Sequence, residues 1–312
     1  MSKKLILVTG GLGFIGKHFV QRCLEIGHYV TNVDVVNYAA DRVKMKSFAE
    51  HSNYRFIQQD ISVMPYLPES DFVVNFAAES HVDNSIADNR QFCVSNFLGT
   101  QRMLELCKSR SPVDGPHFIQ ISTDEVYGDI LSGKHNETDI LKPSNPYSAT
   151  KASADMLVLG WARTYGLRYN ILRITNNYGP HQYPEKLIPK SAWRMSRGLR
   201  AIMHGDGSYV RSWLHVLDTV EAILTVIEKG EPNTIYNIKG DIELQNRFVI
   251  DKIAQILNIK GDYIEPVVNR AGQDLRYSLD DSRLRALGWR PVRDFDVELI
   301  NIVTDLDFQR FI

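Results

Sequence analysis

The N-terminal half of the chain alternates short apolar runs with segments whose apolar residues recur at helical spacing. Leu5–Val8 is a short apolar run that leads into a glycine-rich turn, which is typical of a strand buried on both faces of a parallel sheet. From Phe14 to Leu24 the apolar residues recur every three or four positions, and Gly27 follows at the expected helix end. The pattern therefore predicts a buried strand followed by an amphipathic helix.

This alternation continues to about residue 175. Helical stretches are predicted around 91–108 and 151–165. Further strands are predicted at Tyr29–Val33, Arg55–Gln58, Phe72–Phe76, Phe118–Ile121 and Tyr169–Leu172. Repeated strand–helix units predict an α/β fold built on a doubly wound parallel sheet. After Asn177 prolines crowd together and short helices alternate with isolated strands, so we expect a smaller C-terminal lobe interleaved with the first.

Composition and charge narrow the range of partners. The 312 residues include 36 basic and 37 acidic side chains and carry a net charge of −1, so no nucleic-acid or membrane partner is expected. Cys23, Cys93 and Cys107 are scattered without metal-ligand spacing, as in reduced cytoplasmic proteins. The N-terminus enters the first predicted strand without the layout of a signal peptide, and no apolar run approaches the ~20 residues that span a bilayer. We expect a soluble, cytoplasmic protein.

A glycine motif follows the first predicted strand. Gly10, Gly13 and Gly16 have the spacing that permits a tight turn, close approach of the backbone to a pyrophosphate, and close packing of the next helix. Asp34 closes the second predicted strand, where its carboxylate can accept hydrogen bonds from the hydroxyls of a ribose. Residues 35–37 supply no arginine for a 2′-phosphate. The sequence therefore predicts a site for NAD in preference to NADP.

A second group of chemically reactive residues lies in the middle of the chain. Thr123-Asp124-Glu125 comes just after the strand predicted at 118–121. Tyr147 and Lys151 follow four positions apart, so that on a helix they share one face. A lysine ammonium beside a phenol lowers the pKa of the phenol, and two adjacent carboxyl groups can divide acid and base roles. Each feature alone is common on protein surfaces. Together, and beside a dinucleotide motif, they predict a catalytic cluster.

These motifs resemble the extended short-chain dehydrogenase/reductase superfamily and, within it, the nucleoside-diphosphate-sugar 4,6-dehydratases. The resemblance covers nearly the whole chain, and Asp124-Glu125 is the feature that indicates a dehydratase rather than the superfamily in general. Its strongest blocks are Gly10-Gly-Leu-Gly-Phe-Ile-Gly16, Ala77-Ala-Glu-Ser-His-Val-Asp83, Ser122 to Gly128, Tyr147 to Lys151, Asn176-Asn-Tyr-Gly-Pro180, Pro184-Glu-Lys-Leu-Ile-Pro189 and Gly205-Asp-Gly207.

The resemblance implies a Rossmann sheet and a two-part chain. Residues 1–177 and 212–240 would form the NAD-binding Rossmann domain, and residues 178–211 and 241–312 the nucleotide-sugar-binding lobe. It also implies a cytoplasmic homodimer that supplies deoxysugar synthesis of the rhamnose type. The substrate would be a nucleoside-diphosphate glucose, converted to its 4-keto-6-deoxy form.

The implied chemistry gives each residue of the cluster a role. Tyr147, with Thr123 hydrogen-bonded to the 4-oxygen, would take the proton of the sugar 4-hydroxyl while hydride passes from C4 to NAD. The resulting ketone acidifies C5, so Glu125 can remove the C5 proton while protonated Asp124 assists the departure of the C6 hydroxyl. Hydride then returns to C6, and NAD is regenerated.

Contacts to the two ligands are also implied. The NAD contacts would be Gly10, Gly13, Phe14, Ile15, Gly16, Asp34, Asn37, Asp60, Ile61, Ala77, Ala78, Ser95, Tyr147, Lys151 and Asn177. The substrate contacts would be Ser80, Thr123, Asn176, Lys186, Leu187, Met203, His204, Arg211, Asn246, Arg270 and Asp274. Asp60 fits a turn or helix cap equally well, and a packed strand also explains Met203 and His204. His81 and Asp83 lack a second pair of ligands, so no metal is expected.

The nucleotide lobe departs from the bacterial dTDP-glucose dehydratases, which typically carry Arg-Asp-Trp and Arg-Pro-Gly-His-Asp. This chain has Arg211-Ser212-Trp213 and Arg270-Ala-Gly-Gln273-Asp274 instead. The first departure and the run Tyr183–Lys190 look more like the UDP-glucose 4,6-dehydratase module of eukaryotic UDP-rhamnose synthesis. UDP-glucose is therefore slightly preferred over dTDP-glucose as the expected substrate.

Two other functions remain open. A nucleotide-sugar 4-epimerase would need the same NAD site and Tyr147–Lys151 pair, although such enzymes usually lack the acidic pair. A non-catalytic protein that binds NAD or a nucleotide sugar is the other alternative, and the intact Asp124, Glu125, Tyr147 and Lys151 argue against it.

Overall fold

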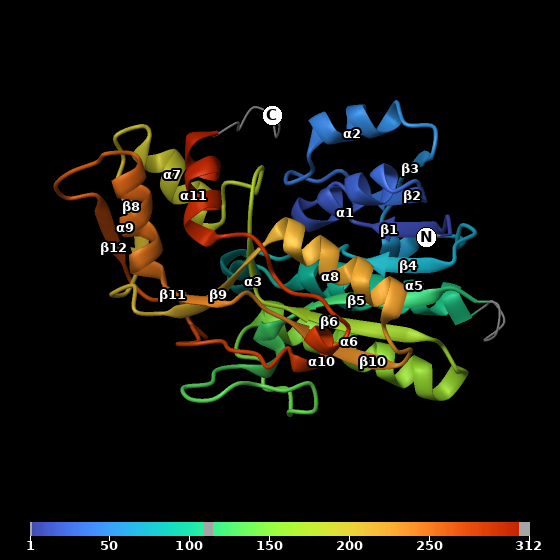
Figure 1. Cartoon of the computed structure of the whole chain (residues 1–312). Helices are drawn as coiled ribbons and strands as arrows, with labels where there is room; N and C mark the ends of the chain where they lie inside the picture. Colours follow the sequence, from blue (N-terminus) through green and yellow to red (C-terminus); the bar gives the residue numbers. More distant parts are fainter. Residues whose placement is uncertain (1, 109–114, 306–312) are drawn as a thin grey trace.

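A seven-stranded parallel sheet forms the centre of the computed structural model, which describes residues 2–108 and 115–305 (Figure 1). The predicted domain ranges also include positions 1, 109–114 and 306–312, which lie outside the described residues. The strand order is β10-β6-β5-β4-β1-β2-β3, and every neighbouring pair is parallel. The strands are β1 (Leu5–Thr9), β2 (Tyr29–Asp34), β3 (Tyr54–Gln58), β4 (Phe72–Asn75), β5 (His117–Thr123), β6 (Tyr169–Ile174) and β10 (Thr234–Ile238). The predicted doubly wound α/β sheet is confirmed.

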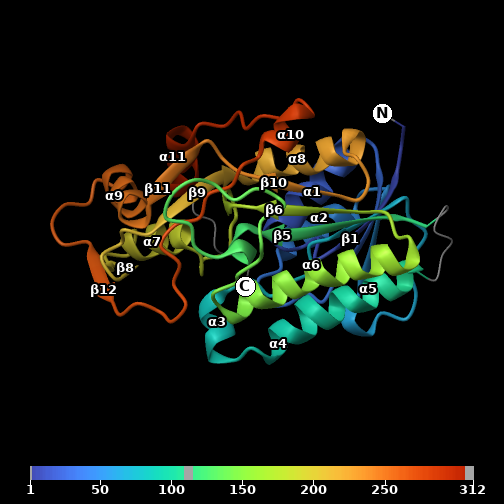
Figure 2. The same ribbon diagram turned by 90° about the horizontal axis from the view of Figure 1, so that it is seen from below.

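Helices cover both faces of this sheet because its strands are apolar on both sides (Figure 2). On one face, α1 (Phe14–Glu25) and α8 (Val216–Lys229) pack on side chains such as Val8. On the other, α5 (Gly99–Lys108) and α6 (Pro146–Tyr165) pack on side chains such as Leu7. The smaller helices of this part are α2 (Arg42–Ala49), α3 (Val82–Ala87), α4 (Arg90–Phe92) and α10 (Ser282–Ala286).

A smaller lobe with its own apolar core lies beside the carboxyl ends of the strands (Figure 1). It holds a three-stranded sheet in the order β11-β9-β7 and a two-stranded parallel sheet of β8 and β12. Its strands are β7 (Asn176–Tyr178), β8 (Ala201–His204), β9 (Val210–His215), β11 (Ile242–Gln245) and β12 (Ile264–Val267), and its helices α7 (Leu187–Met195), α9 (Asn246–Ile256) and α11 (Phe295–Thr304). The chain enters this lobe after β6, returns to the large sheet as β10, and then leaves again, so the two parts interleave as predicted.

Helix α6 begins at Pro146, five residues before the start predicted at 151. The side-chain oxygen of Asn145 accepts a hydrogen bond from the Ser148 amide at 2.9 Å, and the Asn145 amide donates to Ser148 Oγ at 3.2 Å. These reciprocal bonds satisfy backbone donors of the first turn, and proline suits the first helical position. The earlier start brings Tyr147 onto the helix, one turn before Lys151.

The predicted helix at 91–108 is assembled from three parts. Helix α4 is followed by a π-helical segment, Cys93–Leu98, which continues directly into α5. The extra residue in each π-helical turn shifts the side chains that follow around the helix axis. Asn96 and Ser95 lie in this segment, and Asn96 donates hydrogen bonds to the Glu79 carbonyl and the Thr150 hydroxyl.

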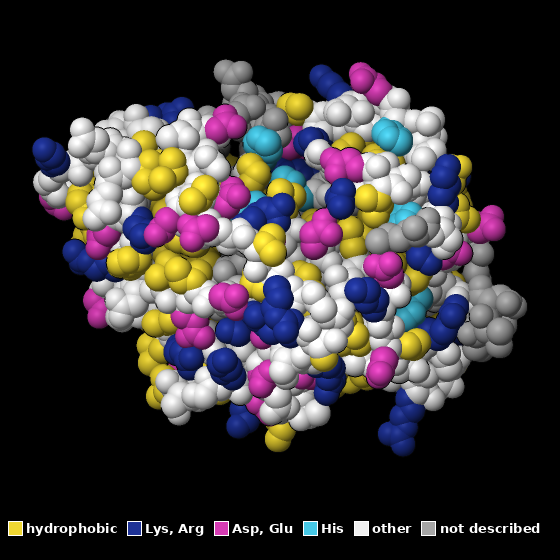
Figure 3. Space-filling model, in the orientation of Figure 1, with side chains coloured by type: hydrophobic (Ala, Val, Ile, Leu, Met, Phe, Trp, Pro, Cys, Tyr) yellow, Lys and Arg dark blue, Asp and Glu magenta, His cyan; other side chains and the backbone are white. Residues whose placement is uncertain are grey.

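Basic and acidic side chains are interspersed over the face seen in Figure 3, in line with the balanced charge of the sequence. Within residues 2–108 and 115–305, no helix is both long enough and apolar enough to cross a bilayer. The same residues contain no cluster of three or more histidine, cysteine or acidic side chains placed to hold a metal ion.

Candidate active site

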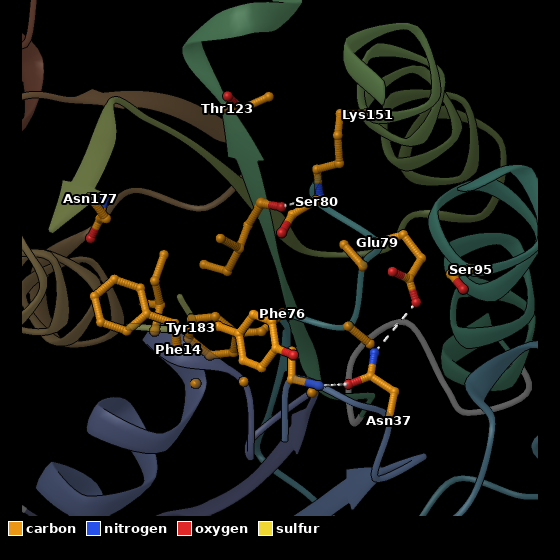
Figure 4. A pocket seen from close by; sticks show the side chains of 18 of the residues that line it. Phe14, Asn37, Phe76, Glu79, Ser80, Ser95, Thr123, Lys151, Asn177 and Tyr183 are labelled. Carbon is orange, nitrogen blue, oxygen red and sulfur yellow. Dashed lines mark hydrogen bonds between the residues drawn. The ribbon is translucent and has the colours of Figure 1, made fainter. Parts of the chain in front are cut away.

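A cavity of about 580 Å³ opens at the carboxyl ends of the central strands, between the large sheet and the smaller lobe (Figure 4). Residues that directly follow β1, β2, β4 and β5 line it, as do Tyr147 and Lys151 of α6. Gln182, Tyr183 and Lys186 line it from the side of the smaller lobe. In open α/β sheets, ligands bind at this end of the strands.

The glycine turn between β1 and α1 leaves backbone exposed where a ligand can approach it. Gly10 has φ +69°, and a Cβ atom there would lie 2.7 Å from the Ala77 nitrogen. A Cβ atom at Gly16 would collide with the Gly10 carbonyl oxygen, so the turn and the helix pack too closely for a side chain. Helix α1 starts at Phe14 without a side-chain cap. Its first amide groups and the positive end of its dipole therefore suit a pyrophosphate.

Asp34 lies at the end of β2, directly beside this turn. One carboxylate oxygen accepts from the Leu12 amide at 3.0 Å and the other from the Val36 amide at 2.8 Å. These two bonds fix the carboxylate at the position that was predicted to hold a ribose. Nearby, the side chain of Asn37 donates to Glu79 at 3.4 Å across the cavity wall (Figure 4).

All of the predicted NAD contacts line this one cavity. Asp60 does so while its side chain also accepts from the Ser62 amide at 2.8 Å and caps a short 3₁₀ turn. The cap interpretation of Asp60 is therefore confirmed, and its contact with NAD stays a prediction. A fixed carboxylate, a side-chain-free turn and an uncapped helix start together fit a dinucleotide such as NAD. Gly10, Gly13, Asp34 and Asp60 would hold its adenosine and phosphate groups.

The predicted catalytic residues line the same cavity. Thr123 ends β5, and its hydroxyl donates to Asp124 Oδ1 at 3.1 Å while accepting from the Glu125 amide at 3.3 Å. Asp124 and Glu125 form a single 3₁₀ turn, and Tyr147 and Lys151 approach from α6. A single strand end and a single helix start therefore supply the whole cluster.

The two neighbouring carboxyl groups have different surroundings. Asp124 is 2% exposed, and burial together with the adjacent Glu125 charge raises its pKa to about 8. Its Oδ2 has no hydrogen-bond partner among the described residues. Burial also raises the pKa of Glu125, but Arg211 and the Asn145 amide act in the opposite direction. Asp124 is therefore suited to hold a proton at neutral pH and Glu125 to accept one.

Lys151 differs from the prediction. Its ammonium donates to the Ile121 carbonyl at 2.5 Å, and burial lowers its pKa to about 8 against the opposing charge of Asp155. Burial and the Glu125 charge raise the pKa of Tyr147, while a hydrogen bond with Thr123 lowers it. The expected lowering of the Tyr147 pKa by Lys151 is thus absent in this arrangement, because Lys151 is directed toward β5.

The structure brings some of the predicted substrate contacts to the cavity and not others. Ser80, Thr123, Asn176 and Lys186 line it, and the Lys186 ammonium donates to the Ser80 carbonyl at 2.8 Å, joining the two lobes. The remaining residues lie in the smaller lobe outside the lining of the cavity: Leu187, Met203, His204, Arg211, Asn246, Arg270 and Asp274.

Those residues have structural partners of their own. The Arg211 guanidinium donates to the Asp274 carbonyl at 2.9 Å and lies 4.4 Å above the Tyr277 ring. Arg270 forms an ion pair with Asp83 at 3.1 Å. Met203 is buried in the apolar core of the smaller lobe, as the packed-strand interpretation expects. Substrate contact by all of these residues stays a prediction.

Sequence reasoning missed several residues around the cluster. Gln182, Tyr183 and Glu185 line the cavity, although the run Tyr183–Lys190 that contains the last two was recognised. Tyr277 donates to Asp274 Oδ2 and lies close enough to Glu125 for that charge to raise its pKa, in addition to burial. An isolated tyrosine in an irregular segment gives no sequence signal. The Asn-Pro start of α6 did give one, through its capping pattern.

Comparisons with known proteins agree with this geometry. The family model described as GDP-mannose 4,6 dehydratase matches residues 7–301. A low-salt glycan biosynthesis protein of Haloferax volcanii is 43% identical over 93% of this chain and 94% of its own length. A trifunctional UDP-glucose 4,6-dehydratase/UDP-4-keto-6-deoxy-D-glucose 3,5-epimerase/UDP-4-keto-L-rhamnose-reductase of Arabidopsis thaliana is 40% identical over 92% of this chain and 45% of its own length.

The same similarity extends to solved structures. The crystal structure of a dTDP-glucose 4,6-dehydratase from Streptomyces venezuelae with NAD bound matches with a TM-score of 0.91 and 39% identity, over 96% of each chain. Both the sequence match and the structural match include the glycine turn, the catalytic turn and the start of α6, because they cover nearly the whole chain. The chain therefore belongs to the GDP-mannose 4,6 dehydratase family within the extended short-chain dehydrogenases/reductases.

Proposed function

We propose that this protein is a lyase that uses NAD to remove water from C5 and C6 of a nucleoside-diphosphate glucose, giving the 4-keto-6-deoxy sugar nucleotide. The observation that carries the proposal is the buried acid Asp124 beside Glu125, in a cavity shared with Tyr147 and the glycine turn. Related dehydratases crystallised with NAD support the choice of cofactor. Bound NAD would accept a hydride from C4 and return it to C6.

The residues of the chain then have separate tasks. Tyr147 takes the proton of the 4-hydroxyl as its phenolate, a form that the hydrogen bond with Thr123 and the positive charge of bound NAD would favour. Thr123, at the end of β5, hydrogen-bonds the same 4-oxygen. Glu125 removes the C5 proton once C4 is a ketone, while Asp124 donates its proton to the C6 hydroxyl, which leaves as water. Glu125 returns a proton to C5 at the end. Exchange with solvent moves the proton gained by Tyr147 to the vacant position on Asp124.

The test is incubation with UDP-glucose or dTDP-glucose, followed by product mass and absorbance of NADH. Loss of one water without accumulation of free NADH is the expected result, because the hydride is returned in every cycle. Release of one NADH per product would indicate an ordinary dehydrogenase. An unchanged mass would indicate a 4-epimerase or a binding protein.

We also propose that UDP-glucose is used at least as efficiently as dTDP-glucose. The residues behind this choice have structural roles near the nucleotide lobe: Ser212 is buried and donates to the Gly240 carbonyl at 3.3 Å, and Gln273 accepts from Arg270 Nε at 2.6 Å. Thymine differs from uracil by one methyl group, which supports about 1–3 kcal/mol of discrimination. A kcat/KM tenfold higher for dTDP-glucose, or about 1.4 kcal/mol, would contradict the proposal.

The division into units and the assembly state are further parts of the proposal. Residues 1–177 and 212–240 would bind NAD, and residues 178–211 and 241–312 the sugar nucleotide. The proposed boundary between residues 211 and 212 falls within β9, the central strand of the three-stranded sheet. A homodimer is expected from the resemblance to the family and is tested by light scattering of the purified protein. Its product would supply deoxysugar synthesis of the rhamnose type.

A further inference from the structure

The carboxylate of Glu125 is held by a residue outside the cavity. Glu125 Oε2 accepts a hydrogen bond from Asn145 Nδ2 at 3.3 Å. Within residues 2–108 and 115–305, Asn145 is the only hydrogen-bond partner of this carboxylate, and Asn145 is not among the residues that line the cavity. Asn145 therefore contacts Glu125 from behind the lining of the cavity.

The orientation of the Asn145 side chain is fixed by the start of α6. Its Oδ1 accepts from the Ser148 amide at 2.9 Å, so the amide nitrogen must point the other way, toward Glu125. Asn145 is 8% exposed, and Pro146 follows at the first helical position. The loop that carries Gly272 also packs on it, since a Cβ atom at Gly272 would lie 3.4 Å from Asn145 Cβ. The side chain has little freedom to turn away.

The same residue thus joins the two halves of the catalytic cluster. Its backbone and Oδ1 start the helix that carries Tyr147 two positions later, while its Nδ2 holds the carboxylate that follows β5. An amide that donates to a carboxylate stabilises the ionised form over the neutral form. Both the position and the charge of Glu125 then depend on Asn145.

We propose that Asn145 is a positioning residue that holds Glu125 ionised and aimed for removal of the C5 proton, separately from its role as the cap of α6. The proposal rests on the proposed dehydratase function. Removing the donor should raise the pKa of Glu125, so water loss should need a higher pH, while oxidation at C4 through Tyr147 continues.

Other charged groups also act on Glu125 and set the background for this effect. Arg211 from β9, Arg270 and Lys186 favour its ionised form, and burial opposes it. Asp124 on the same turn carries a pKa that the Glu125 charge helps to raise, and Tyr147 and Tyr277 respond to that charge in the same direction. These groups are unchanged in variants of Asn145. A shift in the pH dependence of water loss between a variant and the wild type therefore reflects the loss of the amide donor.

Two matched variants separate the donor from the cap. Asn145→Ser keeps a good N-cap residue but has no group long enough to reach Glu125. Asn145→Asp also keeps the cap but places a second carboxylate where the donor was. Asp294→Ser is the control, because Asp294 caps the distant helix α11 through the amides of Asp296 and Val297.

The experiment measures bound NADH and water loss in single turnovers of the NAD-loaded enzyme across pH. For Asn145→Ser the acid limb of water loss should move up by about one pH unit, the size expected for one lost hydrogen bond to a charged group. Asn145→Asp should move it further. Below that limb both variants should accumulate bound NADH, whereas Asp294→Ser should match the wild type.

The proposal is overturned if the acid limb of both variants coincides with that of the wild type, or if NADH formation and water loss fall in parallel at every pH. Parallel loss would show that Asn145 only maintains the helix. If the wild-type protein itself releases no water from either sugar nucleotide, the proposed function has failed instead. The two failures are therefore distinguishable.

Discussion

Replacing Asp124 by asparagine should make the protein less active and more stable at the same time. The carboxyl group is 2% exposed, its Oδ2 lacks a hydrogen-bond partner among the described residues, and its pKa is raised to about 8 from 3.8. Between these two values the folded protein keeps a proton that the unfolded chain has lost. Stability therefore falls as the pH rises through this window, and an asparagine side chain has no proton to lose.

The size of the effect follows from the width of the window. From pH 4 to pH 7 the carboxyl group of Asp124 is mostly ionised in the unfolded chain and protonated in the folded protein. Each pH unit therefore lowers the unfolding free energy of the wild type by about 1.4 kcal/mol. The full cost would be about 4 kcal/mol, and local opening that admits water to the site reduces it. We therefore compare the unfolding free energy of Asp124→Asn with that of the wild type. The difference, variant minus wild type, should increase by about 2–4 kcal/mol as the pH rises from 4 to 7.

The assay is urea unfolding of both proteins at several pH values, together with single-turnover kinetics. The variant should still form bound NADH from the sugar nucleotide, but water loss should slow by about 10²–10⁴-fold, as for loss of a general acid. If the difference in unfolding free energy between the two proteins is the same at pH 4 and pH 7, Asp124 is ionised throughout this range. It could then not be the acid that releases water.

Other predictions follow from the same structure. Glu125→Gln should form bound NADH and the 4-keto hexose and then stall, and normal exchange of the C5 hydrogen in heavy water would show that Glu125 is not the base. Tyr147→Phe should lose even the formation of bound NADH, by about 10²–10⁴-fold in rate. In the wild type, water loss should decline above about pH 8, where Asp124 loses its proton, while NADH formation should not follow this limb. Asp155→Ala leaves the Arg173 guanidinium without its 2.9 Å ion pair in the core and should cost about 3–5 kcal/mol in urea unfolding, whereas a loss below 1 kcal/mol would contradict this reasoning.

The first six strands of the sheet were predictable because each is a short segment rich in β-branched, aromatic or other apolar residues, and α1 because its apolar residues recur at helical spacing. The parallel sheet that they form and the family are confirmed by the structure and the comparisons. β10 was not predicted as a strand of the sheet: it returns to pair with β6 after an excursion of some sixty residues, and such pairing leaves no local pattern. Local sequence determines elements, whereas their long-range partners depend on the packing of the whole chain.

The candidate site shows the same contrast between features that the local sequence determines and features that depend on the packing of the whole chain. The glycine turn, Asp34 and the catalytic residues were identified because spacing within a strand–turn–helix unit fixes where side chains meet. The direction of Lys151 toward the Ile121 carbonyl and the pairing of Arg270 with Asp83 were not, because each joins residues far apart in the sequence. Burial, which gives Asp124 its high pKa, is likewise a property of the folded state alone.

The return of the chain to the large sheet as β10 also limits how the protein can be dissected. A fragment that stops after β6 would leave that strand at an open edge, with the amide and carbonyl groups that normally pair with Thr234–Ile238 unpaired. Exposed edges of this kind promote aggregation. The fragment would also lack α8, and with it the cover for one apolar face of the sheet. Truncation after β6 should therefore yield insoluble material, because the large sheet needs the later segments to cover its edge and its face.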